Sequence, residues 1–275
     1  MKKLIFIILF LTSCSAREIS YEEQSLTIAS LTPMITEILV DLNAGEYIIA
    51  KDIHSERFGI QNTASFDMFA LDMESLIALN PDIIFISFMP ELFESTVLED
   101  RVYTFPTANS IHEIEEQINK IGSIISRNEE AEILINEMNE EIENVLYSVG
   151  SLNIEGRRVY FEIGAHPIFT IGSGVFLNEI IEMLGAVNIF ADYEGWIQAI
   201  DEEIIVRNPY VIVTSVGYVE DPVLEIINRP GFEVIDAVIN ERVIAVEPLV
   251  TSVSNHRTSR AIYYIANAIF PEIRD

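Results

Sequence analysis

Two segments of this chain repeat each other. Residues 74–87 read ESLIALNPDIIFIS and residues 202–215 read EEIIVRNPYVIVTS, and most of their apolar positions exchange one aliphatic residue for another. Each copy predicts a short helix, a turn at Asn-Pro and a buried strand. Proline cannot continue a helix, and the apolar run that follows is too short for anything but a strand covered on both faces. One unit in each half predicts two similar α/β lobes, and the space between two lobes is a common site for small molecules.

The remaining elements also alternate. Strands alternating with helices predict a parallel sheet in each lobe. In the first half we expect strands at 26–30, 47–51 and 101–105, a helix at 33–42 and a long polar loop at 52–67. In the second half we expect strands at 157–163 and 242–247 and helices at 176–184, 221–228 and 258–269.

One helix is expected to join the two halves. After a helix over 111–125, the apolar residues between 128 and 149 recur at helical spacing, and this is the only segment between the two repeat-bearing halves. The predicted organisation is an N-terminal lobe at 25–126, a connecting helix at 127–150 and a C-terminal lobe at 151–275. Because a helix resists bending, the predicted relative motion of the lobes is small.

The first residues are typical of an export signal. Lys2 and Lys3 precede an apolar run, Leu4–Leu11, that is far shorter than the roughly 20 residues of a membrane-spanning helix. Small residues then lead to Cys14, as at a bacterial lipoprotein cleavage site. We expect a signal peptide at 1–13, lipid on Cys14, a tether at 14–24 and an extracytoplasmic protein held to a membrane. An ordinary signal peptide or a buried lone cysteine is the alternative.

Composition limits the partners. The chain has 44 acidic residues against 16 basic ones, a net charge of −28, which excludes nucleic acid as a partner. The same charge disfavours an anionic ligand unless the few arginines gather at the binding site. A single cysteine leaves no intramolecular disulfide.

Several segments together resemble a known family. They are IASLTPMITEILVDLNAG, ESLIALNPDIIFIS, RVYFEIGAHPIFTIGSGVFLNEIIEMLGAVNIFADYEGW, EEIIVRNPYVIV and RPGFEVIDAVINERV. They resemble the helical-backbone solute-binding proteins of ABC importers, which deliver cobalamin, ferric siderophores or haem. The FEIG…IFTIGSG…NIFAD…GW stretch is most similar to the cobalamin-binding members. The resemblance implies two parallel-sheet lobes joined by one long helix, and a monomer that works with a permease and its ATPase subunits.

The resemblance also implies a binding protein without catalysis or a resident cofactor. Its transported ligand would be a corrinoid, with a ferric siderophore, haem, or zinc or manganese as alternatives. An enzyme using His166 or His256 as acid or base is the rival from another class, but no catalytic motif supports it.

Candidate ligand-binding residues follow from a rule for parallel sheets, in which ligands meet the loops after the carboxyl ends of the strands. Many of the side chains so selected are aromatic or thioether groups, which suit a broad and partly apolar ligand. The candidates are His54, Phe66, Met68, Phe69, Phe88, His166, Phe169, Trp196, Tyr218, His256 and Arg257. By the resemblance, Trp196 matches the place of a cleft tryptophan in cobalamin-binding relatives. Phe66, Phe69 and Phe169 have an alternative role as core anchors.

Three of the four histidines, His54, His166 and His256, fall in these loops. Neutral imidazole binds zinc, cobalt and iron well, so one of them could ligate a bound iron or cobalt. Their spacing matches no local metal motif, and a hydrogen-bonding role is the alternative for each.

Glu74 and Glu202 occupy equivalent positions of the repeat, near the starts of their helices. An acid at this place can simply complement the helix dipole. The resemblance implies a second role, in which matching glutamates on the two lobes pair with arginines of the permease and orient the docked complex.

Overall fold

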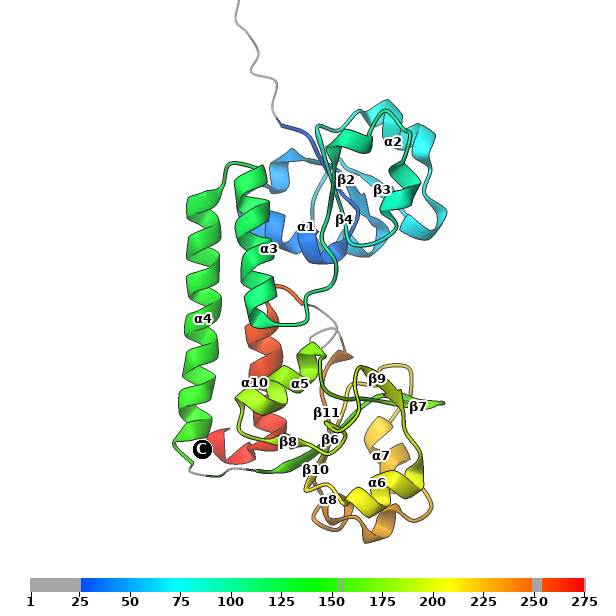
Figure 1. The fold of residues 1–275 in the computed structure, drawn as a ribbon, viewed down its shortest axis with the longest axis vertical. Coiled ribbons are helices and arrows are strands. Elements are labelled where there is room, and N and C mark those ends of the chain that lie inside the picture. Colours follow the sequence, from blue (N-terminus) through cyan, green and yellow to red (C-terminus); the bar gives the residue numbers. More distant parts are fainter. Residues whose placement is uncertain (1–25, 153, 155, 249–253, 275) are drawn as a thin grey trace, which may run out of the picture.

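The computed structural model describes residues 26–152, 154, 156–248 and 254–274. The signal peptide, the tether and the lipidation site predicted at 1–24 lie outside these residues. Figure 1 shows two α/β lobes, one above the other, to one side of the long helix α4.

The first lobe is built on sheet A. Its elements are β1 (Ile28–Ser30), α1 (Pro33–Asp41), β2 (Ile48–Asp52), β3 (Ala64–Phe66), α2 (Met73–Leu79), β4 (Ile83–Ile86) and β5 (Val102–Thr104). The strand order is β3-β2-β1-β4-β5, and every neighbouring pair is parallel. The polar loop predicted at 52–67 is more structured than expected, because it contains β3 and a 3₁₀ helix, Ile53–Phe58.

The second lobe is built on sheet B. Its elements are β6 (Arg158–Ala165), β7 (Ile168–Ile171), α5 (Phe176–Met183), β8 (Val187–Asn188), β9 (Trp196–Gln198), α6 (Asp201–Arg207), β10 (Val211–Thr214), α7 (Pro222–Ile227), α8 (Asp236–Ile239), β11 (Val243–Ala245) and α10 (Thr258–Ile269). The strand order is β11-β10-β6-β7-β9, with β8 also paired to β6.

Sheet B corrects one detail of the predicted fold. The α/β class with two lobes is confirmed, but β7 runs antiparallel to both β6 and β9, so this sheet is mixed. Only residues 166 and 167 separate β6 from β7. A connection this short can join antiparallel neighbours only, since a parallel crossover needs a dozen or more residues.

The two repeats form equivalent units, as predicted. α2 leads to β4 and α6 leads to β10, and each of these strands pairs with the first strand of its lobe, β1 or β6. Asn80 and Asn208 end the helices in the left-handed region, with φ of 50° and 41°. Asparagine tolerates this conformation, and the proline that follows each asparagine prevents further helix.

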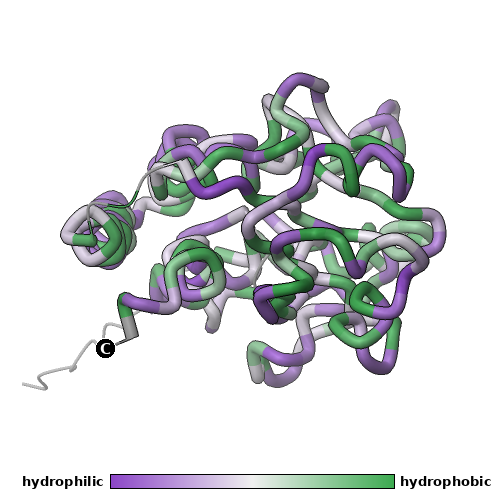
Figure 2. Tube along the Cα trace, turned by 90° about the horizontal axis from the view of Figure 1, so that it is seen from below, coloured by the Kyte–Doolittle hydropathy of each residue, from purple (hydrophilic) through white to green (hydrophobic). Residues whose placement is uncertain are grey.

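Helices α3 (Ile111–Ile124) and α4 (Asn128–Gly150) lie between the lobes in sequence. The 23 residues of α4 give a rod of roughly 35 Å. Its buried face is the predicted one: Ala131, Leu134, Met138, Ile142, Val145 and Val149. α3 and α10 pack on it, and Figure 2 shows α4 end-on at the margin of the molecule.

One hydrophobic core runs through the whole molecule. A single cluster of buried side chains includes Ile28 of sheet A, Ile121 of α3, Met138 of α4, Phe161 of sheet B and Ile265 of α10. Smaller clusters fill the outer half of each lobe. None of the helices in the described ranges is long and apolar enough to cross a membrane.

Candidate ligand-binding site

The first lobe exposes a pair of stacked phenylalanines. Phe69, in the turn after β3, is 80% exposed, and its ring centroid lies 5.3 Å from that of Phe88, which follows β4. The Asp67 carboxylate accepts a hydrogen bond of 2.9 Å from the Phe69 backbone N–H and so fixes the turn. Exposed rings in contact with each other form a flat apolar surface that remains available to a ligand.

The second lobe exposes aromatic side chains along β7 and β9. In the antiparallel ladder Phe169 lies opposite Gln198, Thr170 opposite Ile197, and Ile171 opposite Trp196. Since paired residues of a ladder share a face and the face alternates along each strand, Phe169, Gln198 and Trp196 project to one side. Trp196 is 61% exposed. β9 lies on the side of the second lobe that faces the first lobe (Figure 1).

Backbone contacts hold Trp196 in this edge strand. Gly172 donates a 2.8 Å hydrogen bond to the carbonyl of Gly195, and Gly195 donates one of 2.9 Å to Ser173. A Cβ on Gly172 would meet the Tyr193 carbonyl oxygen at 2.4 Å, so only glycine allows the two segments to approach this closely. Trp196 therefore opens a strand, where the sequence predicted a loop before the second repeat helix.

Tyr218 belongs to the same region of the second lobe. It follows β10, it is 68% exposed, and its hydroxyl oxygen accepts a 2.8 Å hydrogen bond from the backbone N–H of Ala165 at the end of β6. This bond places the Tyr218 ring beside the β6–β7 hairpin that carries Phe169.

Two residues predicted to face the ligand lie in the core instead. Phe66 and Met68 are buried, and both pack with Leu76, Ile84 and Phe93 inside the first lobe. The sequence left this role open for Phe66. Phe66 and Met68 are buried because the chain forms the unexpected strand β3. Its last residue, Phe66, points into the lobe, and of the three predicted residues only Phe69 is exposed.

The three loop histidines lie in different surroundings. The His54 and His166 side chains are exposed, and His166 Nε2 lies 3.6 Å from a Glu225 carboxylate oxygen. His256 is only 4% exposed. Among the described residues, no group of three or more His, Cys, Asp or Glu side chains is arranged to hold a metal ion.

His256 and Arg257 connect the two lobes. His256 Nε2 lies 2.6 Å from Oδ2 of Asp41 on α1, and Arg257 Nη2 donates to the same oxygen at 2.6 Å. Asn255 donates a 2.9 Å hydrogen bond to Glu37, also on α1. Burial alone would raise the pKa of Asp41, but the hydrogen bonds and charges of His256 and Arg257 outweigh it and hold that pKa below its usual value. We call these five residues the interlobe contact.

Glu74 and Glu202 are both exposed in the first turns of their helices. α2 and α6 lie on the side of the molecule away from α4 (Figure 1). Glu202 also lines a pocket of about 580 Å³ between the β6–β7 turn, the start of α6 and the end of α7. His166, Glu225 and Arg229 line the same pocket, so the structure brings together His166 and Glu202, to which the sequence assigned separate roles.

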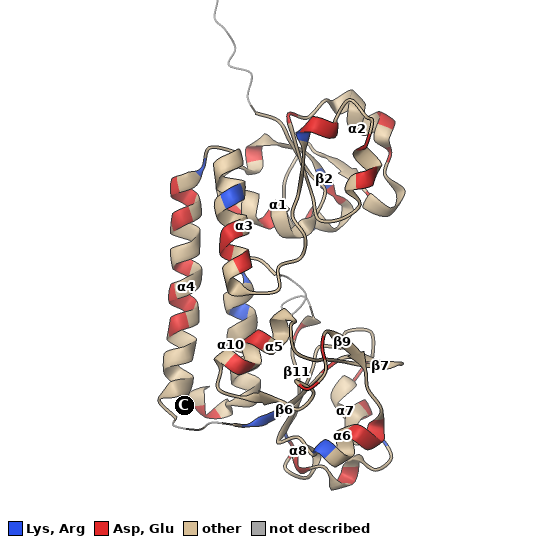
Figure 3. Cartoon of the chain, viewed as in Figure 1, with Lys and Arg blue, Asp and Glu red and all other residues tan. Residues whose placement is uncertain are grey.

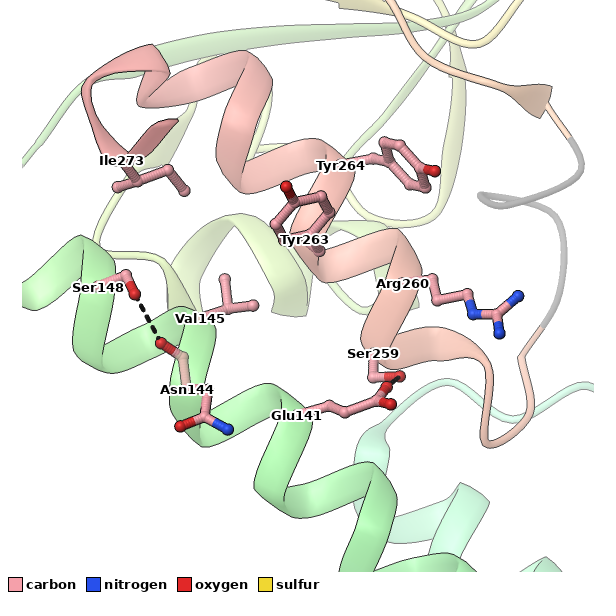
Figure 4. A pocket seen from close by; sticks show the side chains of 9 residues that line it. All are labelled: Glu141, Asn144, Val145, Ser148, Ser259, Arg260, Tyr263, Tyr264 and Ile273. Carbon is pink, nitrogen blue, oxygen red and sulfur yellow. Dashed lines mark hydrogen bonds between the residues drawn. The ribbon is translucent and has the colours of Figure 1, made fainter. Parts of the chain in front are cut away.

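A second concave site lies elsewhere. Figure 4 shows a groove of about 500 Å³ between α4 and α10. It is lined by Glu141, Asn144, Val145, Ser148, Ser259, Arg260, Tyr263, Tyr264 and Ile273. Arg260 points away from α4 in this view. None of the predicted ligand-binding residues lines this groove, which is the seam between two packed helices.

Sequence reasoning missed some of these residues. Asp41 and Glu37 of the interlobe contact come from a segment distant from residues 255–257, and only the tertiary fold brings them together. Gln198 could have been found, because the alternation Trp-Ile-Gln predicts that it shares a face with Trp196.

Two α/β lobes beside a long helix are the fold of two-lobe solute-binding proteins. The family model described as periplasmic binding protein matches residues 28–248, and the chain belongs to this family.

Similar proteins narrow the class. The chain is 27% identical to the uncharacterized ABC transporter substrate-binding lipoprotein YvrC of Bacillus subtilis, over 94% of this chain and 84% of that protein. It is 24% identical to a vitamin B12-binding protein of Pectobacterium carotovorum, over 68% of this chain and 70% of the relative. A crystal structure of a possible iron-binding periplasmic solute-binding protein from Staphylococcus epidermidis matches with a TM-score of 0.79 and 28% identity, covering 89% of this chain and 98% of that one.

The chain is therefore an ABC-transporter substrate-binding protein of the cobalamin, siderophore and haem class. Members of this family are extracytoplasmic, bind a small molecule, work with a permease and an ATPase, and are not enzymes.

Proposed function

We propose that this protein is a lipid-anchored receptor that captures a corrinoid, cobalamin or cobinamide, and delivers it to an ABC permease. The observation that carries the proposal is the pair of aromatic surfaces, Phe69 with Phe88 on one lobe and Phe169 with Trp196 on the other. A corrin ring is broad and rigid and has apolar faces, and exposed aromatic rings on two sides suit such a ligand.

The relative named for vitamin B12 supports a corrinoid, whereas the relative named for iron supports the alternative of a ferric siderophore or haem. A zinc or manganese ion is a third candidate. It is favoured less, because the described His, Asp and Glu side chains form no group that could hold a metal.

The parts of the chain have separate tasks in this proposal. Residues 25–126 and 151–275 are the two lobes, residues 127–150 connect them, and residues 1–13 direct export. Cys14 carries the lipid and 14–24 is the tether. Intact mass of the protein extracted from membranes tests the anchor. We expect the mass of a chain that starts at Cys14 and carries acyl groups. This acylated species should be absent in Cys14→Ser.

The ligand is tested by titration with cyanocobalamin. Trp196 is the single tryptophan of the chain, so its fluorescence, corrected for absorbance by the ligand, reports binding near β9. We expect saturable one-to-one quenching. No quenching, together with no bound pink ligand after gel filtration, would reject the corrinoid and make an iron chelate the first candidate.

A variant tests the aromatic surface itself. We expect Phe69→Ala to weaken corrinoid binding about 10-fold or more, since an aromatic contact of this kind is worth ~0.5–1.5 kcal/mol beyond its buried area. Tyr147→Ala is the matched control, because Tyr147 is equally exposed but lies on α4. Equal effects of the two changes would contradict a ligand at Phe69.

A further inference from the structure

Six basic side chains of the described residues are neutralised by carboxylates. Arg229 pairs with Glu162 and Glu225, and Arg207 pairs with Asp192 and Glu203. The other pairs are Lys51 with Glu56, Arg127 with Glu130, Arg157 with Glu272, and Arg257 with Asp41. A cation with a carboxylate in contact has little charge left to attract an anionic ligand.

Three of the remaining cations lie at the edge of the sheets opposite to the ligand-facing loops. Arg101 immediately precedes β5, Arg158 opens β6 and Arg242 immediately precedes β11. All three residues lie at the amino ends of their strands. β5 is parallel to β4, and β6, β10 and β11 are parallel to one another, so these amino ends lie at the opposite edge of each sheet from the loops after β4, β6 and β10. Figure 3 shows basic segments on α3, on α10 and at the start of β6.

The ligand-facing loops themselves are acidic. Carboxylates flank the aromatic residues of both lobes within three positions. Glu91 after Phe88, Glu194 before Trp196 and Glu220 after Tyr218 are exposed, and the half-buried Asp67 precedes Phe69. Between β2 and β3, the described structure pairs no carboxylate with Arg57, whose guanidinium lies 4.8 Å from the Phe58 ring centroid.

We infer that this site selects its ligand by charge: it accepts a neutral or cationic ligand with apolar faces and rejects polyanionic ones. The inference rests on the proposed function, since it concerns the same aromatic site. Neutral corrinoids and neutral ferric tris-hydroxamates satisfy it. Ferric tris-catecholates, with three negative charges, and haem, with two carboxylates, meet repulsion from the loop carboxylates.

Two ferric chelates of similar size test the inference. We would measure binding of neutral ferrichrome and of trianionic ferric enterobactin to the purified protein by Trp196 fluorescence and by equilibrium dialysis, beside cyanocobalamin and haemin. We expect enterobactin and haemin to bind at least 10-fold more weakly than the tightest neutral ligand at 20 mM salt. The difference should shrink at 500 mM salt, because salt screens exposed charges.

The outcomes separate the two proposals. If ferric enterobactin or haemin binds as tightly as any neutral ligand, charge selection is overturned while the solute-binding role stands. If no ligand of the panel binds, the proposed corrinoid or iron-chelate function fails and the inference fails with it.

A charge reversal sharpens the test. Glu91→Lys should raise the affinity for ferric enterobactin, relative to that for cyanocobalamin, about 3- to 10-fold. Glu137→Lys, an exposed acid on α4, makes the same change in net charge and is the control. An equal gain from Glu137→Lys would show that the total charge, and not the charge of the site, sets the preference.

Discussion

A buried ion pair lies beneath the β6–β7 hairpin. Glu162 in β6 is fully buried, and both of its carboxylate oxygens accept hydrogen bonds from Arg229, at 2.6 and 2.8 Å. Tyr160 donates a third bond to Glu162, and burial together with this carboxylate raises the pKa of the Tyr160 hydroxyl. Burial alone would lower the pKa of Arg229, but its bonds to Glu162 and Glu225 raise it.

Arg229→Met should therefore destabilise the protein strongly. Removing one partner leaves the Glu162 charge buried without compensation, which costs about 3–5 kcal/mol. The free energy of unfolding from urea titration measures the effect. Arg127→Met breaks a more exposed pair with Glu130 and should cost about 1 kcal/mol or less. Similar losses in both variants would contradict this difference.

A second arginine binds the end of the chain to sheet B. Arg157, which immediately precedes β6, donates hydrogen bonds to both carboxylate oxygens of Glu272, and these bonds lower the pKa of Glu272. A carboxyl whose pKa is lower in the folded state than in the unfolded chain stabilises the fold above its unfolded pKa, about 4.3 for Glu. That stability is lost as the pH falls through the folded value.

Glu272→Gln should consequently lower stability at pH 7 and matter less in acid. We expect the gap in unfolding free energy between the natural protein and the variant to persist at pH 5 and to narrow below about pH 4. Denaturant titrations at several pH values measure the gap. Glu137→Gln on α4 is the control, and a gap that does not change with pH would contradict the assignment.

At the scale of elements, short strands decide where the ligand-facing side chains lie. β3 and β9 each have three residues, too short a run for the sequence to distinguish a strand from a loop. They become strands because β2 and β7 offer them free edges. This explains why Phe66 is buried although the sequence placed it in a loop, and why Trp196 projects from a strand.

The interlobe contact also joins elements distant in the chain. It connects α1 to the residues just before α10, and His256 is buried within it. Asp41→Asn removes the charge that His256 and Arg257 share, so we expect a loss of ~1–3 kcal/mol. Amide hydrogen exchange should become faster in α1 and in residues 254–258.

Glu46→Gln is the control for this variant, because Glu46 is exposed just after α1 and takes no part in the contact. If Asp41→Asn left the exchange in both segments unchanged, the contact would not restrain the lobes.

At the scale of the molecule, α2 and α6 present Glu74 and Glu202 on two lobes that one continuous core holds together. Fixed spacing between two charges suits docking on a permease, since paired charges orient a complex and speed its formation. We expect Glu74→Arg and Glu202→Arg each to reduce stimulation of the transporter's ATPase about 10-fold or more.

Cyanocobalamin binding should remain within 2-fold in both docking variants, which separates docking from capture. Glu137→Arg on α4 changes the net charge equally and should leave the ATPase stimulation unaltered. Full stimulation by the Glu74 and Glu202 variants would rule out docking through these residues.

The sequence by itself determined the elements whose signals are local and repeated. The Asn-Pro repeats and the helical period over 128–149 predicted two α/β lobes and the long helix, because each signal depends on residues close together in the chain. The solute-binding class was implied by the resemblance of several segments to a known family. Only the tertiary structure decided which side chains meet. His256 was predicted to face a ligand, but it pairs with Asp41, while Phe69 and Phe88 stack although 19 residues apart in the chain. Such contacts depend on strand order and packing between distant segments, which no local pattern encodes.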